Sequence, residues 1–420
     1  MSKSNVKYLL VVGFTFFVSS CAEDKPLNTF EPEGPKAQSI YDLMTPLVWV
    51  IMAIIFVLVV GGTILIALKG RVRPGEDLDD LPDQIHGNLK LEWAWTAAPA
   101  VLLAALCIPM VNSIWELEEK NEESELDVMV IGQQWWWEYR YDVNGNGFFR
   151  DANGDGKIDD LDKKLPLDIS LDREDVVSAT ELVIPAGQQI DLTIASRDVI
   201  HSFWIPRLNG KRDAVPGRLH TWSVEADQPG KYTGWCTEFC GLSHARMRMS
   251  TVALSDADFA AWLENQSQLA EVPEDEDALA GREVFIGQCT SCHVINDGSD
   301  SDRYDDDFYE NVPLDSGAAP NLTHFASRST FAGGIYNTYV GPVGDPNDNK
   351  LDVADYLKLS EYANDPESEY RFNTPELKRW VQNASSRKDM APDEQQGMIS
   401  FESLSNDDLD AVVAYLETLK

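Results

Sequence analysis

The sequence predicts a multidomain chain anchored in a membrane: a two-helix transmembrane hairpin, then a β-sandwich, then an all-α domain. Three observations carry this fold class. Two long uncharged stretches lie within residues 43–118, short runs of alternating apolar and polar residues fill 119–255, and helical patterns dominate 278–420. A length of 420 residues also favours two or three folding units of about 100–200 residues each.

The N-terminus resembles a lipoprotein-type signal peptide over residues 1–20. Lys3 and Lys7 precede a short apolar core, and the small residues of "VSSC" lead to Cys21. Cleavage there would leave Cys21 as the lipidated first residue of an N-terminal periplasmic segment, residues 21–42. An uncleaved anchor with an incidental cysteine is the alternative.

Residues 47–68 and 93–115 carry no charge, and each is long enough as a helix to cross a hydrocarbon core of about 30 Å. Lys69, Arg71 and Arg73 follow the first span, which places the connecting loop on the cytoplasmic side. We therefore expect a bacterial inner-membrane protein that contacts lipid through two spans, with everything after about residue 116 in the periplasm.

The outer region divides by composition. Runs such as "ELVIPAGQQIDLTIAS" and "GKYTGWC" predict an antiparallel β-sandwich or barrel over 119–255. A helix and an acidic linker follow over 256–277, and the amphipathic "NDDLDAVVAYLETLK" closes the last domain. The net charge of −36 argues against nucleic acid as a partner and favours a basic protein partner.

The stretch "GWCTEFCGLSHARM" concentrates potential metal ligands: Cys236, Cys240, His244 and Met247. A disulfide is possible outside the cytoplasm, and so is a tetrahedral zinc site with a fourth donor. The Met247 thioether favours copper over both. His201, at the end of a predicted strand, would complete a blue-copper set, and two thiolates would allow a pair of bridged coppers.

Several motifs over about residues 40–255 resemble subunit II of haem–copper cytochrome c oxidases: "QWWWEYRY", "ELVIPAGQ", "DVIHSFWIPRLNGKRDAVPGR" and "CTEFCGLSHARM". The resemblance implies a cupredoxin-like sandwich that holds a binuclear CuA centre. It implies bridging by Cys236 and Cys240, one copper each for His201 and His244, and weak ligation by Met247 and the Glu238 carbonyl.

The same resemblance implies three further roles. The Glu238 side chain would face a magnesium site shared with subunit I. Trp135 would be the exit for electrons toward haem a. Glu92 would lie at the entrance of a proton channel into subunit I, although an acid at the start of a membrane helix explains Glu92 equally well.

"CTSCH" has the spacing for covalent attachment of a c-type haem through Cys289 and Cys292, with His293 as axial ligand. We expect Met390 as distal ligand in preference to Met398, because class I cytochromes c place this methionine in a polar, proline-bearing loop. "APNLTHF" resembles the Pro-x-Leu turn of that family, in which Pro320 would offer its carbonyl to His293.

An acidic insertion at residues 142–175 contains a pattern similar to a calcium-binding loop. The expected ligands are Asp151, Asn153, Asp155, Lys157 (through its carbonyl), Asp159 and Asp162. A solvated acidic hairpin is the alternative reading.

These features together resemble subunit II of a caa-type cytochrome c oxidase with a fused class I cytochrome c domain. The resemblance implies that electrons enter at the haem, pass to CuA and leave for subunit I, where oxygen is reduced to water and protons are pumped. Partners would be subunit I, other subunits, and a soluble cytochrome c or bc-type complex. The alternatives are a CuA-bearing nitric oxide reductase subunit and a membrane-tethered copper-delivery or thiol-exchange protein.

Overall fold

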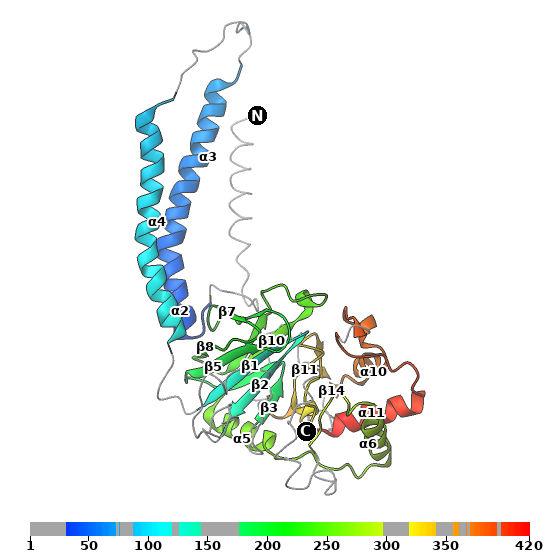
Figure 1. Ribbon diagram of the computed structural model, residues 1–420. Coiled ribbons are helices and arrows are strands. Elements are labelled where there is room, and N and C mark those ends of the chain that lie inside the picture. Colours follow the sequence, from blue (N-terminus) through cyan, green and yellow to red (C-terminus); the bar gives the residue numbers. More distant parts are fainter. Residues whose placement is uncertain are drawn as a thin grey trace.

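The computed structural model describes residues 31–72, 75, 87–119, 126–143, 176–296, 319–341, 356–359, 361, 367, 370–392 and 396–420. A helical hairpin stands above a β-sandwich, and a mainly helical C-terminal domain lies beside the sandwich (Figure 1). The predicted fold class is confirmed in these three parts.

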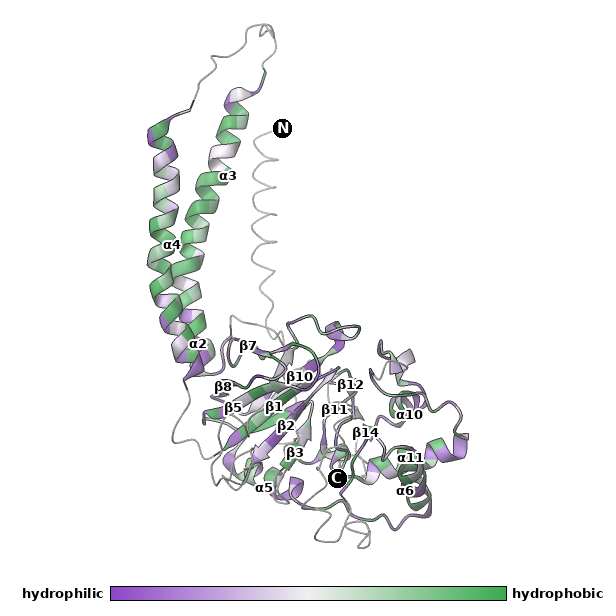
Figure 2. Cartoon of the chain, viewed as in Figure 1, coloured by the Kyte–Doolittle hydropathy of each residue, from purple (hydrophilic) through white to green (hydrophobic). Residues whose placement is uncertain are grey.

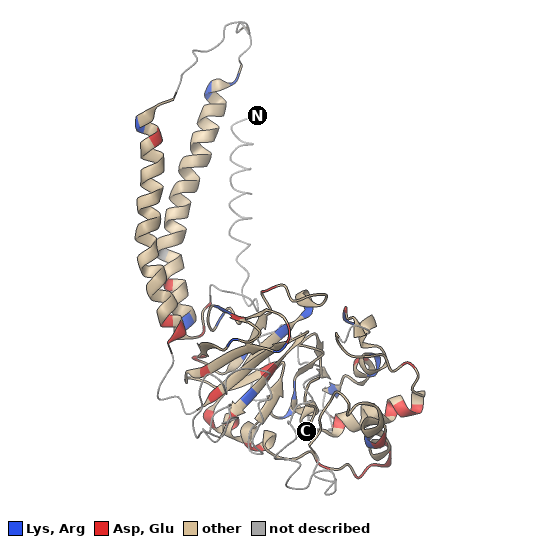
Figure 3. Ribbon diagram, in the orientation of Figure 1, with Lys and Arg blue, Asp and Glu red and all other residues tan. Residues whose placement is uncertain are grey.

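The hairpin consists of two long helical stretches. The first runs without a break through α2 (Pro35–Leu43), the π-helical η1 (Met44–Trp49) and α3 (Val50–Gly70), and α4 (Leu89–Glu118) returns in the opposite direction (Figure 1). Both stretches are long and apolar enough to cross a membrane, and no side chain of α3 or α4 is buried. Figure 2 shows that hydrophobic residues run along both helices, and Figure 3 shows that their charged residues lie near the ends.

The base of the hairpin is fixed to the sandwich. The Arg207 guanidinium pairs with Glu33 and donates to the Glu31 carbonyl at 3.0 Å, while Arg212 pairs with Glu118 at the end of α4. A Cβ at Gly34 would lie 2.1 Å from the Glu225 carbonyl oxygen, so only glycine allows this close approach. The membrane anchor therefore has a defined orientation on the outer domain.

The sandwich has two main sheets and one additional strand pair. The five-stranded sheet has the order β3 (Val176–Ala179), β2 (Trp136–Asp142), β1 (Asp127–Gln133), β5 (Ile190–Ser196) and β8 (His220–Val224). The three-stranded sheet has the order β4 (Glu181–Pro185), β10 (Arg248–Leu254) and β9 (Gly230–Trp235). Strand β6 (His201–Trp204) pairs with β7 (Lys211–Ala214).

The expectation of a purely antiparallel sandwich is wrong in two pairings. Strand β1 pairs in parallel with β5, and β10 pairs in parallel with β4. Parallel neighbours need a long connection, and here the intervening strands supply it. The alternating pattern of a single strand does not reveal the direction of its neighbour.

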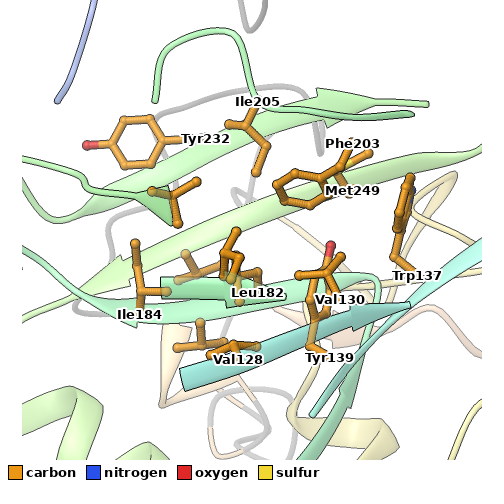
Figure 4. Close-up of a cluster of buried hydrophobic side chains, with 14 of the residues drawn as sticks. Val128, Val130, Trp137, Tyr139, Leu182, Ile184, Phe203, Ile205, Tyr232 and Met249 are labelled. Carbon is orange, nitrogen blue, oxygen red and sulfur yellow. The ribbon is translucent and has the colours of Figure 1, made fainter. Parts of the chain in front are cut away.

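Apolar side chains from both sheets meet between the layers (Figure 4). Val130 of β1, Tyr139 of β2 and Leu182 of β4 are fully buried there, and Phe203 of β6 and Met249 of β10 are 1% exposed. Burial of large apolar side chains contributes about 1.5–3 kcal/mol each. This core holds strands β9 and β10 in place, and the connection between these two strands extends from the edge of the sandwich.

The C-terminal domain is built on crossed helices. Helix α5 (Asp256–Gln266) still packs on the sandwich, and α6 (Glu276–Gln288) crosses α11 (Asn406–Thr418). The rings of Phe285 and Tyr415 meet edge to face at 5.8 Å, and a Cβ at Gly281 would lie 1.9 Å from the Ala411 carbonyl oxygen. The described part of this domain also contains α10 (Thr374–Gln382), the short helical turns η3 (Phe325–Ser327) and η4 (Ala384–Ser386), and two strand pairs, β11 (Thr330–Phe331) with β12 (Tyr336–Asn337) and β13 (Tyr339–Val340) with β14 (Arg371–Phe372).

The sandwich and the C-terminal domain share a buried interface. Tyr339, Tyr356 and Leu359 belong to the same apolar cluster as the sandwich core. Glu181 of β4 is fully buried at this interface and accepts hydrogen bonds from Ser329 N (3.0 Å), Thr330 Oγ1 (2.9 Å) and the Tyr356 hydroxyl (2.8 Å). The two domains are therefore joined by a buried carboxylate network as well as by apolar packing.

The charge of Glu181 stabilises this interface. Burial alone would raise the pKa of the Glu181 carboxyl, but Lys231 at 3.5 Å and the hydrogen bonds from Ser329 and Tyr356 together lower the pKa below its usual value. A carboxyl with a depressed folded-state pKa contributes stability above its unfolded pKa of about 4.3, and the contribution disappears as pH falls through the folded value.

We expect Glu181→Gln to lower the free energy of unfolding of the full chain by about 3 kcal/mol at pH 7, because it leaves buried partners of a charged group uncompensated. The difference from wild type should stay constant above about pH 5 and shrink below about pH 4. Denaturant unfolding over this pH range measures it, with the exposed Glu402→Gln as matched control. An equal difference at pH 7 and pH 3.5 would contradict the assignment.

Candidate metal centres

The connection between β9 and β10, residues 236–247, forms a closed loop that we call the copper loop. The Cys236 amide donates to the Met247 carbonyl at 3.0 Å and closes the loop at its base. The Thr237 amide donates to the Ser202 carbonyl at 3.1 Å and ties the loop to β6, which begins at His201. This hydrogen bond brings His201 to residues more than 30 positions later in the chain.

The sequence-predicted copper ligands converge in this loop. Cys236 Sγ lies 3.7 Å from Cys240 Sγ, 3.9 Å from His201 Nδ1 and 3.3 Å from the Glu238 carbonyl oxygen. Cys240 Sγ lies 3.6 Å from His244 Nδ1 and 3.8 Å from Met247 Sδ. Each sulfur therefore has one imidazole nitrogen and one weaker donor beside it.

This arrangement separates the alternatives left open by the sequence. Both cysteines are free, and a sulfur–sulfur distance of 3.7 Å is far from the roughly 2.05 Å of a disulfide. Within the described part of the chain, one group has the geometry to hold a single ion: His201, Cys236 and Cys240. His244 is outside that group although it adjoins Cys240, so the donors suit two neighbouring metal positions better than one tetrahedral zinc.

The pKa values of the two thiols, Cys236 and Cys240, are shifted in opposite directions. The hydrogen bond from the Cys240 thiol is the main cause of a lowered pKa at Cys236, whereas the same contact and burial raise the pKa of Cys240. One thiolate is therefore favoured even without metal, and a cation between the sulfurs would favour the second.

Asp198 orients the imidazole of His201 through the ring nitrogen Nε2. Its Nε2 lies 2.8 Å from Asp198 Oδ1, and that carboxylate accepts the Gln134 amide at 2.7 Å and the Val199 amide at 2.6 Å. Burial alone would lower the pKa of His201, but Asp198 and Cys236 raise it overall. Such a partner holds Nδ1 toward the sulfur of Cys236.

Sequence reasoning missed Gly132, which lies directly under this imidazole. A Cβ at Gly132 would lie 2.9 Å from His201 Cδ2 and 3.1 Å from Cγ, so any side chain there displaces the ring. Its only sequence signal is a glycine inside the otherwise regular strand β1, a position that often marks the close approach of another group.

Trp135 connects the copper loop to the C-terminal domain. Its indole Nε1 donates to the Cys240 carbonyl at 2.9 Å, and its own carbonyl accepts Lys388 Nζ at 2.7 Å. The side chain is 2% exposed. Burial lowers the pKa of Lys388 to about 7.

The second cluster follows the end of α6. Cys289 is buried, Cys292 is half-buried, and the His293 amide donates to the Cys289 carbonyl at 2.9 Å. His293 Nδ1 donates to the Pro320 carbonyl at 2.8 Å, which confirms the contact predicted from the Pro-x-Leu turn. Burial lowers the pKa of His293, and with the proton on Nδ1 the lone pair of Nε2 is available to a metal.

The two candidate distal methionines pack differently. Met390 packs against the apolar cluster of the sandwich, whereas Met398 packs against the cluster that contains Cys289, Phe285 and Phe401. Ala391 and Gln396 form a bridge, and Gly397 (φ +99°) lies so close to Met390 that a Cβ would be 2.5 Å from its Sδ. The distal ligand stays a prediction: the sequence favours Met390, whereas packing against the cluster that contains Cys289 favours Met398.

The other predicted site residues stay predictions. The Glu238 side chain is exposed, as a site shared with a partner requires, and Glu92 is exposed in the first turn of α4. The calcium-loop residues 151–162 and Cys21 lie outside the described residues.

Comparisons with known proteins agree with both clusters. The family described as "Cytochrome C oxidase subunit II, periplasmic domain" matches residues 126–254, and the family "Cytochrome c" matches residues 278–420. Cytochrome c oxidase subunit 2 of Alkalihalophilus pseudofirmus is 28% identical over 100% of this chain and 98% of its own length. The probable cytochrome c oxidase subunit 2 of Rickettsia prowazekii is 30% identical over 63% of this chain and 80% of its own length.

A solved structure is similar over the sandwich region. It is the periplasmic domain of subunit II of cytochrome oxidase from Bradyrhizobium japonicum, which is 25% identical, covers 36% of this chain and 96% of its own, and has a TM-score of 0.27. The assignment of this chain to a family rests on the sequence matches. The chain belongs to the cytochrome c oxidase subunit 2 family, carries an additional cytochrome c domain, and has an electron-transfer role in a haem–copper oxidase.

Proposed function

We propose that this chain accepts electrons at a haem c on Cys289, Cys292 and His293, and passes them through a binuclear CuA centre to haem a of subunit I. The observation that carries the proposal is the paired geometry of the copper loop, in which each of two sulfurs 3.7 Å apart has its own histidine. The two thiolates of Cys236 and Cys240, the imidazoles of His201 and His244 and the thioether of Met247 would hold the copper pair.

The residues present fit these groups. When bound, the copper pair and the haem would each take up and release one electron without making or breaking a covalent bond. His201, Cys236, Cys240 and Met247 are nearly inaccessible to solvent and already adjacent, so little rearrangement of the chain accompanies binding. The His293–Pro320 hydrogen bond likewise holds the proximal imidazole in one orientation.

Trp135 belongs on the entry side of this path. The resemblance implied an exit toward haem a, but Trp135 contacts the Cys240 carbonyl on one side and Lys388 of the cytochrome c domain on the other. A residue in contact with both domains lies between the haem domain and the copper loop. We therefore assign it to the step that brings electrons to copper.

The remaining parts of the proposal follow from the same assignment. The copper loop and cytochrome c domain lie in the periplasm of a bacterial inner membrane, subunit I holds the oxygen-reducing site, and the exposed Glu238 carboxylate faces it at a shared magnesium site. An acidic surface suits a basic cytochrome c as the outside donor.

The full chain, matured with copper and haem, should show a mixed-valence binuclear copper signal in electron spin resonance together with a c-type haem absorption band. Cys240→Ser should abolish the binuclear signal, because a hydroxyl cannot replace a bridging thiolate, and should leave the haem band unchanged. A wild-type chain with the haem band and only mononuclear copper would overturn the CuA assignment.

Replacement of each methionine separately identifies the distal haem ligand. We expect Met398→Leu to remove the sulfur-to-iron absorption band and to lower the haem reduction potential, because a thioether ligand raises that potential. Met390→Leu, a change of similar volume, should retain both properties. The opposite result would restore Met390 as the ligand.

Gly132→Ala should weaken copper binding about 10–100-fold, the usual effect of disturbing a residue that orients a metal ligand, because its Cβ displaces the His201 ring. Gly287→Ala is the matched control, since a Cβ at Gly287 meets nothing within 4 Å. Copper content after equilibrium dialysis measures both. Equal copper affinity of the two variants would contradict the role of Gly132.

A further inference from the structure

Three consecutive residues of the cytochrome c domain, 387–389, contact the copper side of the interface. We call them the docking segment. Arg246 donates to the Arg387 carbonyl at 2.7 Å, Ser243 donates to the Asp389 carbonyl at 2.5 Å, and Lys388 donates to the Trp135 carbonyl at 2.7 Å. The segment is immediately followed by the loop that carries Met390 and Met398.

Lys388 differs from its two neighbours because its side chain makes the contact. It is 3% exposed, which is rare for lysine, and its Nζ also donates to the Ala332 carbonyl at 3.1 Å. The Lys388 amine thus binds the Ala332 carbonyl of the cytochrome c domain and, at the same time, the Trp135 carbonyl beside the copper loop. Within the described residues, Lys388 forms no ion pair with a carboxylate, so these two carbonyls are what compensates its burial.

The surrounding backbone leaves space for this amine. Gly333 has φ of +72°, and a Cβ there would lie 2.7 Å from Lys388 Nζ and 2.7 Å from the Trp135 carbonyl oxygen. A side chain at position 333 would therefore separate the two groups. The contact depends on a lysine from one loop and a glycine from another, both in the cytochrome c domain.

Hydrogen bonds continue from Lys388 to the copper loop. Lys388 Nζ binds the Trp135 carbonyl, and Trp135 Nε1 binds the carbonyl of Cys240, one of the two bridging cysteines. A shift of the docking segment away from Trp135 would lengthen the gap between the loop that carries Met390 and Met398 and the copper ligands. The second set of interdomain contacts, around Glu181 and Ser329, involves no copper ligand.

We propose that Lys388 is a positioning residue for electron transfer, which fixes the distance between the loop that carries Met390 and Met398 and the Trp135–Cys240 contact. The proposal rests on the proposed function for its electron-transfer consequence. The positioning itself is a property of the chain and can be measured without either cofactor.

The test uses the full chain in detergent with Lys388→Met and, independently, Gly333→Ala, which displaces the same amine while keeping the lysine. Lys378→Met, at a partly exposed pair with Asp410, controls for loss of a lysine, and Ser329→Ala, which removes the hydroxyl contacts with Glu181 and Lys231, controls for loss of an interdomain contact elsewhere. In the cofactor-free chain, hydrogen–deuterium exchange should accelerate in peptides covering 384–391 and 234–247 for the first two variants only.

In the loaded chain, the haem and copper spectra and both reduction potentials should match wild type in all four variants. The rate of copper reduction after flash reduction of the haem should fall several-fold in Lys388→Met and Gly333→Ala, because the rate of electron transfer falls steeply as donor and acceptor move apart. The two control variants should stay within about twofold of wild type.

Two results would overturn the proposal: unchanged exchange in Lys388→Met, or a rate loss in Ser329→Ala as large as in Lys388→Met. The second result would mean that Lys388 is only one of several interdomain contacts on which the rate depends. Absence of any haem-to-copper transfer in wild type would instead refute the proposed function, and the exchange measurement would then decide the positioning role alone.

Discussion

The hydrogen bond from the Cys236 amide to the Met247 carbonyl is the constraint on which the rest of the copper site depends. It closes twelve residues into one loop, so that Cys240 and His244 must lie above the strand ends. The Thr237–Ser202 hydrogen bond then adds His201 from β6. Because both are backbone contacts of residues that adjoin strands of the sandwich, the sandwich core supplies the rigidity that electron transfer with little ligand movement requires.

The sequence predicted those features that depend on residues close to one another in the chain. Uncharged length identified α3 and α4, and the spacing of Cys236, Cys240, His244 and Met247 indicated ligands on one loop because these residues are close in the chain. His201 was found through a known motif, and the Pro320 contact through a turn pattern. The parallel pairings of β1 with β5 and β4 with β10 were missed, because alternation within a strand carries no information on its partner.

Contacts between distant segments could not be predicted in this way. Lys388 and Trp135 are 253 positions apart, and Glu181 and Ser329 are 148 apart, so no local pattern joins them. The two methionines illustrate a subtler limit. Both stand in polar loops ahead of the last helix, and only the side on which each packs distinguishes them.

The buried interface between the two outer domains has a kinetic consequence. Glu181 and Lys388 are nearly inaccessible to solvent, so dissolved ions screen their contacts little. If electrons take the proposed path, their transfer from the cytochrome c domain to the copper loop would be a unimolecular event whose rate does not depend on ionic strength. Arrival of an outside donor at a surface with a net charge of −36 is bimolecular and strongly salt-sensitive. On the proposed path, salt would therefore change the rate at which an outside donor delivers electrons, but not the rate of the transfer inside the chain that follows.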